Sequence, residues 1–375
     1  MNMEQIYNFD DIRPYHDDEV NAALRRIAAD PYFGVICNYV YPEKSAEEVA
    51  EFISGITSVR DFQYSVMRAF NEQVIKRSIR NFTYSGIENI PHDRACLFVS
   101  NHRDIVLDAC LMQYILFLND LPTTQITFGS NLMSSQLLID IGRCNRMFRV
   151  ERPGQASARQ FYEQSLKLSS YLHHVISGLG ESVWIAQRNG RTKNGIDRTS
   201  PAVIKMFGMA DRHNPVRALA DLCIVPVSVS YQFEPCAAFK ARENLANAAG
   251  GYVKAPGEDL HSILSGITQY KGDVHFNFGK PLDFDTLWHL EEIAPQRFPE
   301  AVAEYMDNVI VNGYKLHSTN YIAADYLTGN KQYSDKYSAI VADGFISEIN
   351  SIGDDGVANA VFEIYANPIL KNVLD

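Results

Sequence analysis

The chain has 375 residues, of which 46% are hydrophobic and 21% are charged, and it shows no low-complexity tract or internal repeat, which excludes a disordered or fibrous protein. Its formal net charge of −11 argues against general nucleic-acid binding, because neutralising phosphates needs a broad basic surface. At this length the chain can bury a substantial core, in two domains or in one domain with helical additions.

The first part of the chain, residues 1–85, is predicted to be helical. Its clearest signal is the amphipathic stretch 59–79, in which apolar side chains recur at four-residue steps from Phe62 to Val74. The same stretch is basic, and two interpretations stay open. In the first, the basic face of the helix binds anionic lipid. In the second, which we favour, the apolar stripe packs on the domain that follows and the basic side chains are exposed.

From residue 86 to 285, short apolar runs alternate with helical segments, which is typical of a layered α/β domain. We predict a mixed sheet flanked by helices, with a helical region before it and a helical, acidic region after it at 286–375. The predicted strands are 95–100, 125–129, 147–151, 182–187, 223–231 and 274–279, and helices are expected at 156–177 and 202–211.

The most informative segment is the polar stretch 100–108, which follows an apolar run. It contains His102, Asp104 and Asp108 at a predicted strand-to-helix turn, a common place for catalytic side chains in open α/β folds. The apolar segment 109–117 is long enough for a buried helix. A histidine beside a carboxylate indicates proton transfer. The alternative is that the histidine and one aspartate merely cap the helix.

A second segment is the strand-like run 147–151. Its alternation places Phe148 and Val150 on one face and Arg149 and Glu151 on the other, and Arg152 follows at the end of the strand. Arginines beyond a strand end are well placed to grip a phosphate with two parallel hydrogen bonds. An ordinary surface strand is the alternative.

The third segment, 184–193, is an apolar strand that runs into a glycine-containing turn. Arg188, Gly190, Arg191 and Lys193 lie in this turn, which can bring backbone N–H groups and cations close to an anion. It lacks the glycine and lysine spacing of a nucleotide-binding loop, so an ATPase is excluded. A plain Asn-Gly turn is the alternative.

The fourth segment, 224–231, is apolar and β-branched but contains Pro226. Because proline has no N–H to donate to a sheet, we expect this strand to lie at an edge or to be interrupted at Pro226. Its expected role is to shape a wall of the site.

Basic residues are concentrated in one part of the chain. Residues 143–217 contain thirteen Lys and Arg against five Asp and Glu, a balance of +8 that leaves −19 for the rest. A basic island in an acidic protein favours binding of a small anion, and a solvated face of mixed charge is the alternative.

The six cysteines show no short paired spacing, so we predict reduced thiols in the core. No apolar run is long enough to cross a bilayer, and the first residues lack the pattern of a secretion signal. We therefore expect a cytoplasmic protein, at most peripheral on the inner face of the cell membrane.

In this order the four segments resemble those of the glycerolipid acyltransferases, the family of glycerol-3-phosphate and lysophosphatidate acyltransferases. The resemblance covers about residues 95–231. In that family a His-Asp pair is followed by a Phe-and-Arg strand, a Gly-Arg turn and an apolar strand containing proline. The corresponding residues here are His102 with Asp108, Phe148 with Arg149 and Arg152, Gly190 with Arg191, and Pro226.

Two features depart from the family pattern. The family separates its His and Asp by four residues, whereas five residues separate His102 from Asp108, so Asp104 stays open as the partner. A glutamate usually stands beside the glycine of the third segment, where this chain has Arg188 and Asn189.

The resemblance implies transfer of an acyl group from acyl-CoA or acyl carrier protein to a hydroxyl of glycerol 3-phosphate or its lyso product. Neutral His102, oriented by an aspartate, would remove the proton of the hydroxyl, with no acyl-enzyme, metal or organic cofactor. Cationic residues would hold the phosphate of the acceptor. The residues expected at the substrate are Asn101, Arg103, Phe148, Arg149, Arg152, Arg188, Gly190, Arg191, Lys193 and Pro226.

Two alternatives belong to other functional classes. The shifted His-Asp spacing is compatible with a catalytically silent relative that binds anionic lipid or acyl carrier protein. A thioester hydrolase would use the same pair with water, but it needs no phosphate site, and the basic island argues against it.

Overall fold

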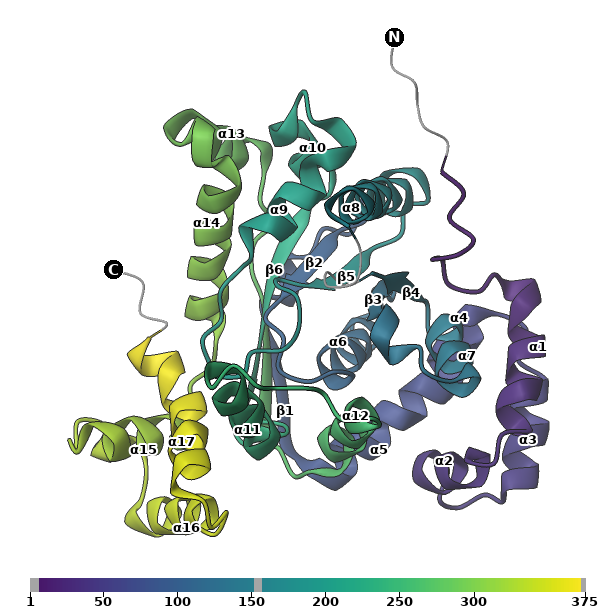
Figure 1. The fold of residues 1–375 in the computed structure, drawn as a ribbon. Helices are drawn as coiled ribbons and strands as arrows, with labels where there is room; N and C mark the ends of the chain where they lie inside the picture. The colour runs from purple at the N-terminus through teal and green to yellow at the C-terminus, as the bar shows by residue number, and fades with distance from the viewer. Residues whose placement is uncertain (1–6, 152–156, 372–375) are drawn as a thin grey trace.

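A central β-sheet forms the middle layer of the molecule, with helices on both faces and further helices at each end of the chain (Figure 1). The strands are β1 (Ile79–Ser85), β2 (Leu97–Ser100), β3 (Gln125–Gly129), β4 (Met147–Val150), β5 (Val183–Ala186), β6 (Ile224–Tyr231) and β7 (Gly272–Phe278). The computed structural model describes residues 7–151 and 157–371, and within them these strands form one seven-stranded sheet in the order β1-β7-β6-β2-β5-β3-β4. The strands from β6 to β4 run parallel, β7 is antiparallel to β6, and β1 is parallel to β7.

The helices fall into three groups along the chain. Before the sheet lie α1 (Asp17–Ala28), α2 (Phe33–Val40), α3 (Ala46–Ser54), α4 (Val59–Phe62) and α5 (Arg68–Ser78). Between the strands lie α6 (Leu107–Leu118), α7 (Gln136–Cys144), α8 (Ala158–His173), α9 (Pro201–Phe207), α10 (Pro215–Asp221), α11 (Ala237–Ala248) and α12 (Glu258–Thr268). After the last strand come α13 (Phe284–Ile293), α14 (Phe298–Gly313), α15 (Ser318–Thr328), α16 (Ala339–Asn350) and α17 (Asp355–Leu370).

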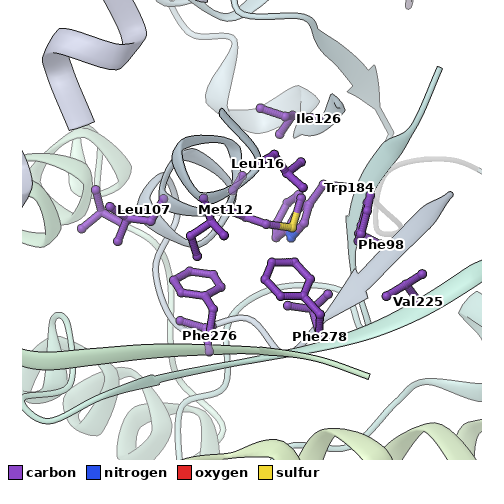
Figure 2. Packing of buried hydrophobic residues seen from close by; sticks show 14 of the residues in the cluster. Phe98, Leu107, Met112, Leu116, Ile126, Trp184, Val225, Phe276 and Phe278 are labelled. Carbon is purple, nitrogen blue, oxygen red and sulfur yellow. The ribbon is translucent and has the colours of Figure 1, made fainter. Parts of the chain in front are cut away.

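The central strand β2 is buried on both faces. Phe98 belongs to the core cluster on the α6 side, and Leu97 and Val99 belong to the cluster that includes residues of α8 and α14. In the first cluster, Met112 and Leu116 of α6 pack over aromatic side chains of the sheet (Figure 2). This double burial explains why the run before His102 is uniformly apolar, and it fixes the end of β2 firmly in space.

The predicted fold class is confirmed, because the structure is a mixed sheet flanked by helices. The six predicted strands correspond to β2 through β7. The amphipathic stretch 59–79 forms α4, a π-helical turn at Gln63–Met67, and α5. Phe62 and Val74 are buried in core clusters, so the apolar stripe packs on the protein itself.

Residues 79–85 were predicted to be helical, and this prediction is wrong, because they form the edge strand β1. Phe82 and Tyr84 pack on the core, while Asn81, Thr83 and Ser85 on the other face are exposed. The alternation of these five residues was the signal that could have revealed the strand. The helical pattern of residues 59–79 directly precedes this alternation, and we extended the helical prediction through it.

Of the two alternatives predicted for the strand with Pro226, the edge position is wrong, whereas an interruption at Pro226 agrees with the point at which the pairing with β7 ends. β6 lies inside the sheet, paired with β2 on one side and β7 on the other. The pairing of β7 ends with Phe278 opposite Val227, and the N–H of Gly279 donates to the carbonyl of Pro226 (2.8 Å). The missing N–H of proline therefore removes a bond at the end of the β6–β7 ladder, where its cost is small.

All six cysteines are buried and free, as predicted. In the parts of the chain that the structure describes, none of the helices combines the length and the apolar character needed to span a bilayer.

Candidate active site

The loops that follow β2 and β5 meet at the carboxyl edge of the parallel strands. Ser100 of β2 lies opposite Ala186 of β5, and the N–H of Gln187 donates to the carbonyl of Ser100 (2.8 Å). Farther along, the N–H of Thr192 donates to the carbonyl of His102 (2.9 Å). The second loop, residues 188–199, is called the cationic loop below. These bonds bring it directly beside the histidine, at the edge where open α/β folds bind ligands.

His102 is paired with Asp108. Its Nδ1 lies 2.9 Å from Asp108 Oδ2, and the side chain of His102 is 13% exposed whereas that of Asp108 is 1% exposed. An Nδ1–H donated to the carboxylate leaves Nε2 as the basic nitrogen, and no described residue forms a hydrogen bond with it. The ring packs edge-on against Trp184. A neutral imidazole with one nitrogen fixed and the other free is the arrangement of a general base.

The carboxylate of Asp108 is held by four hydrogen bonds from described residues. Besides the histidine, Oδ2 accepts the backbone N–H groups of Arg103 (2.6 Å) and Asp104 (2.9 Å), and Oδ1 accepts the hydroxyl of Tyr231 (2.8 Å). The two backbone donors show that the turn folds around the carboxylate, which accommodates the additional residue between His102 and Asp108. Burial raises the pKa of Tyr231 well above its usual range, so the phenol stays protonated and donates.

Asp104 has a different task. Its Oδ1 accepts the N–H groups of Val106 (2.9 Å) and Leu107 (2.8 Å) and so caps the first turn of α6. Burial and the charge of Asp108 raise the pKa of Asp104. The choice between the two carboxylates that the sequence left open is therefore settled in geometry, because Asp108 faces the histidine and Asp104 caps the helix.

Asn101 and Arg103, both expected at the substrate, are buried instead. The Asn101 side chain exchanges two hydrogen bonds with the backbone of Val229 in β6 (2.7 and 3.0 Å). Arg103 is 1% exposed and pairs with Asp197 (2.5 Å) and Glu234 (3.2 Å). The sequence could not show that these two side chains point inward, because Val229, Asp197 and Glu234 are remote from them along the chain. Both residues support the histidine loop from inside.

Lys240 of α11 completes this buried network and was not identified from the sequence. Its Nζ donates to the carbonyl of Arg103 (2.5 Å) and to Glu234 Oε1 (2.6 Å), and the side chain is 0% exposed. A lysine in a helix of mixed composition gives no local signal of such a role. It holds the backbone directly after His102 in place.

The cationic loop brings several of the predicted anion ligands together. Arg191 is 9% exposed, and its Nη1 has no hydrogen-bond partner among the described residues. Lys193 forms an ion pair with Glu243 of α11, and Arg188 is half-buried without an ion-pair partner in the described ranges. Gly190 has φ of +76°, a left-handed conformation that glycine adopts without strain.

The residues predicted on the second segment lie elsewhere. Phe148 is buried in the core against Tyr171, and Arg149 on β4 pairs with Glu151 (2.6 Å). β4 is the outer strand, separated from β2 by β5 and β3, which corresponds to about 14 Å of sheet. Arg152 lies outside the described residues. The structure thus does not bring Phe148 and Arg149 to His102.

Several cations of the basic island are neutralised locally. The ion pairs are Arg146 with Glu181, Arg149 with Glu151, Arg159 with Glu163, Lys167 with Asp11, Lys193 with Glu243, and Arg217 with Asp221. Arg188 and Arg191 are therefore the cations best placed to attract an anion beside His102. Over the described ranges, no group of three or more His, Cys, Asp or Glu side chains is arranged to hold a metal ion.

Comparison with known proteins connects this site to one family. Residues 81–230 match the acyltransferase family model. The glycerol-3-phosphate acyltransferase of Pseudomonas paraeruginosa is 25% identical over 279 residues, which cover 69% of this chain and 31% of that protein. The glycerol-3-phosphate acyltransferase of Ectopseudomonas mendocina is 23% identical over 342 residues, covering 83% and 38%. The chain thus spans about a third of the length of these curated relatives.

Among solved structures, the 1-acyl-sn-glycerophosphate (LPA) acyltransferase of Thermotoga maritima is similar with a TM-score of 0.36 and 15% identity. The match covers 77% of this chain and 94% of that one. The segment matched by the family model contains the His102–Asp108 pair, Arg191 and Pro226.

Proposed function

We propose that this chain, whose residues 81–230 match the acyltransferase family model, is a glycerolipid acyltransferase that moves a fatty acyl group from a thioester to the hydroxyl of a phosphorylated glycerol in phospholipid synthesis. The donor is acyl-CoA or acyl carrier protein, and the acceptor is glycerol 3-phosphate or lysophosphatidate. The observation that carries the proposal is the His102–Asp108 pair with Nε2 free, directly beside the cationic loop.

The proposed reaction needs one base and no covalent enzyme intermediate. His102 Nε2 takes the hydroxyl proton while the oxygen attacks the thioester carbonyl, and Asp108 stabilises the imidazolium that forms. When the tetrahedral intermediate collapses, the C–S bond breaks and the departing thiolate takes the proton back from His102. The products are an ester and a free thiol. General-base catalysis of this kind contributes about 10²–10⁴-fold.

Binding of the acceptor phosphate would orient the acceptor hydroxyl relative to His102 and the thioester. The guanidinium of Arg191 is nearly buried and has an unsatisfied Nη1, so an incoming phosphate oxygen would complete its hydrogen bonds. Arg188 adds a second positive charge from the same loop. Holding the acceptor in line with the thioester accounts for much of the remaining rate enhancement. A hydrolase acting with water would not need this anchor.

The proposal is tested with purified protein, a radiolabelled acyl-CoA or acyl carrier protein, and three acceptors: glycerol 3-phosphate, lysophosphatidate and glycerol. We expect labelled ester with a phosphorylated acceptor and far less with glycerol. Loss of thioester without ester would identify a hydrolase instead. Tight binding of phosphorylated lipid with no turnover of any donor would identify a catalytically silent relative.

Lys193 is paired with Glu243, and loss of its proton would leave that carboxylate uncompensated beside the cationic loop, which should weaken acceptor binding at alkaline pH. Burial lowers the pKa of Lys193 to about 8, and neighbouring Arg191 adds to the effect. Its charge is therefore present below pH 8 and lost as the pH rises through 8, while the acceptor phosphate stays dianionic because its second pKa is about 6. We expect the KM for the acceptor to rise about fivefold between pH 7 and 9, the equivalent of about 1 kcal/mol.

The matched control for this pH effect is Lys193→Arg, which keeps its charge over the whole range. Initial rates against acceptor concentration at several pH values give the comparison. A KM that rises equally in wild type and Lys193→Arg would contradict the assignment to Lys193.

A further inference from the structure

The last described helix, α17, contacts the cationic loop. The side-chain amide of Asn367 donates to the carbonyl of Asn194 (2.7 Å), and Arg198 donates to the carbonyl of Lys371 at the end of the helix (3.0 Å). Asn367 is only 8% exposed. A helix that begins 125 residues beyond the family-matched segment therefore supports the loop that carries Arg191.

The backbone of the loop lies directly against this helix at Gly195. Gly195 has φ of +77°, and a Cβ atom placed there would lie 2.1 Å from the carbonyl oxygen of Ile364. Only glycine fits such a close approach. The loop thus contacts α17 through two adjacent residues. The carbonyl of Asn194 accepts a hydrogen bond from the helix, and the backbone of Gly195 packs directly against it.

The loop is braced internally between α17 and His102. Asn194 Oδ1 accepts the N–H of Ile196 (3.1 Å), and the hydroxyl proton of Thr192 is shared between Asn194 Oδ1 (3.3 Å) and the carbonyl of Ile196 (3.1 Å). The N–H of Thr192 donates to the carbonyl of His102. A short chain of hydrogen bonds therefore runs from Asn367 through Asn194 and Thr192 to His102. Arg191 is the residue next to Thr192, so its position depends on this chain.

The helix itself is fixed to the site on a second side. The hydroxyl of Tyr365 in α17 accepts the N–H of Glu234 (2.9 Å), and Glu234 pairs with the buried Arg103 that follows His102. Asn320 of α15 donates to the carbonyl of Tyr365 (2.8 Å). α17 is thus held by the histidine loop network and by its neighbour helix, which makes it a rigid support.

We propose that α17 positions the cationic loop for the phosphate of the acceptor, with Asn367 and Gly195 as positioning residues. Neither residue touches substrate. They act by holding the Arg191 guanidinium at a fixed place relative to His102. This inference rests on the proposed function, since the ligand it names is the phosphorylated acceptor of that reaction.

The test uses the full chain with Asn367→Leu, which keeps the branched shape of the side chain, in a larger volume, but removes the donor to Asn194. The control is Asn359→Leu, the same change at an exposed position of the same helix. For each protein we measure kcat, the KM for glycerol 3-phosphate and for acyl-CoA, the Kd of glycerol 3-phosphate by calorimetry, and the melting temperature.

We expect Asn367→Leu to raise both the KM and the Kd for glycerol 3-phosphate about tenfold, a factor typical of a lost buried hydrogen bond, with the KM for acyl-CoA unchanged. Asn359→Leu should leave the melting temperature and both acceptor constants close to the wild-type values. Acceptor constants unchanged in Asn367→Leu, or raised equally in both variants, would overturn the inference.

If wild type neither binds glycerol 3-phosphate nor transfers an acyl group, the proposed function fails and the role of α17 is decided separately. Hydrogen exchange of residues 188–199 then provides the measurement. Faster exchange in Asn367→Leu, but not in Asn359→Leu, supports the positioning role. Equal exchange in all three proteins overturns it.

Discussion

Replacing His102 with alanine should lower kcat by about 10²–10⁴-fold, which is the contribution of a positioned general base. The residual rate reflects orientation of the two substrates, which the variant retains because the cationic loop is unchanged. For the same reason the KM for the phosphorylated acceptor should change little. Initial rates with saturating acyl-CoA and varied glycerol 3-phosphate separate the two constants.

A surface histidine provides the matched control. His213 lies in an exposed turn, and its backbone N–H bonds to Asp211. His213→Ala should therefore have the kcat of wild type. The assignment of the base would be wrong if His102→Ala kept its kcat within about threefold of wild type, or if its loss came mainly from a raised KM.

Local sequence signals were sufficient for most of the fold. Strands buried on both faces, such as β2 and β6, are continuous apolar runs and are visible without knowledge of their neighbours. The place of a strand in the sheet is a different kind of property. The edge and the interruption at Pro226 stayed open as alternatives, because the end of β7, which leaves room for the missing N–H, is more than 50 residues away in the chain.

The candidate site also combines local features, which a sequence can reveal, with features that depend on remote segments, which it cannot. His102, Asp104 and Asp108 lie within seven residues of one another, so their proximity could be predicted, but their orientation could not. Arg103 stands in the same segment, and its inward direction depends on Asp197 and Glu234, which the chain supplies about 94 and 131 residues later.

Contacts between remote segments left no local signal. Tyr231 bonds to Asp108 across 123 residues, and Asn367 bonds to Asn194 across 173 residues. A tyrosine ending an apolar strand and an asparagine in a C-terminal helix are each unremarkable in sequence. The parts of the site that hold the reacting groups in place are therefore those that a single sequence predicts least well.

The second large effect is expected from Asp108→Asn, which should lower kcat by about 10²–10⁴-fold, as in other sites where an aspartate orients a catalytic histidine. The amide can keep the fold. Its oxygen can accept the backbone N–H groups of Arg103 and Asp104, while its NH₂ group faces the hydroxyl of Tyr231, which is able to accept. What disappears is the negative charge that stabilises the imidazolium of His102 during proton transfer.

Asp104→Asn is the comparison that makes this prediction specific, because it makes the same chemical change four residues away. Its oxygen can still accept the N–H groups of Val106 and Leu107, so the cap of α6 is kept. Since Asp104 is buried and its pKa is raised, removing its charge relieves a buried carboxylate. We expect a kcat within about fivefold of wild type and an unchanged or slightly higher melting temperature. A larger loss of kcat in Asp104→Asn than in Asp108→Asn would show that the catalytic partner of His102 is Asp104, against the geometry of the hydrogen bonds.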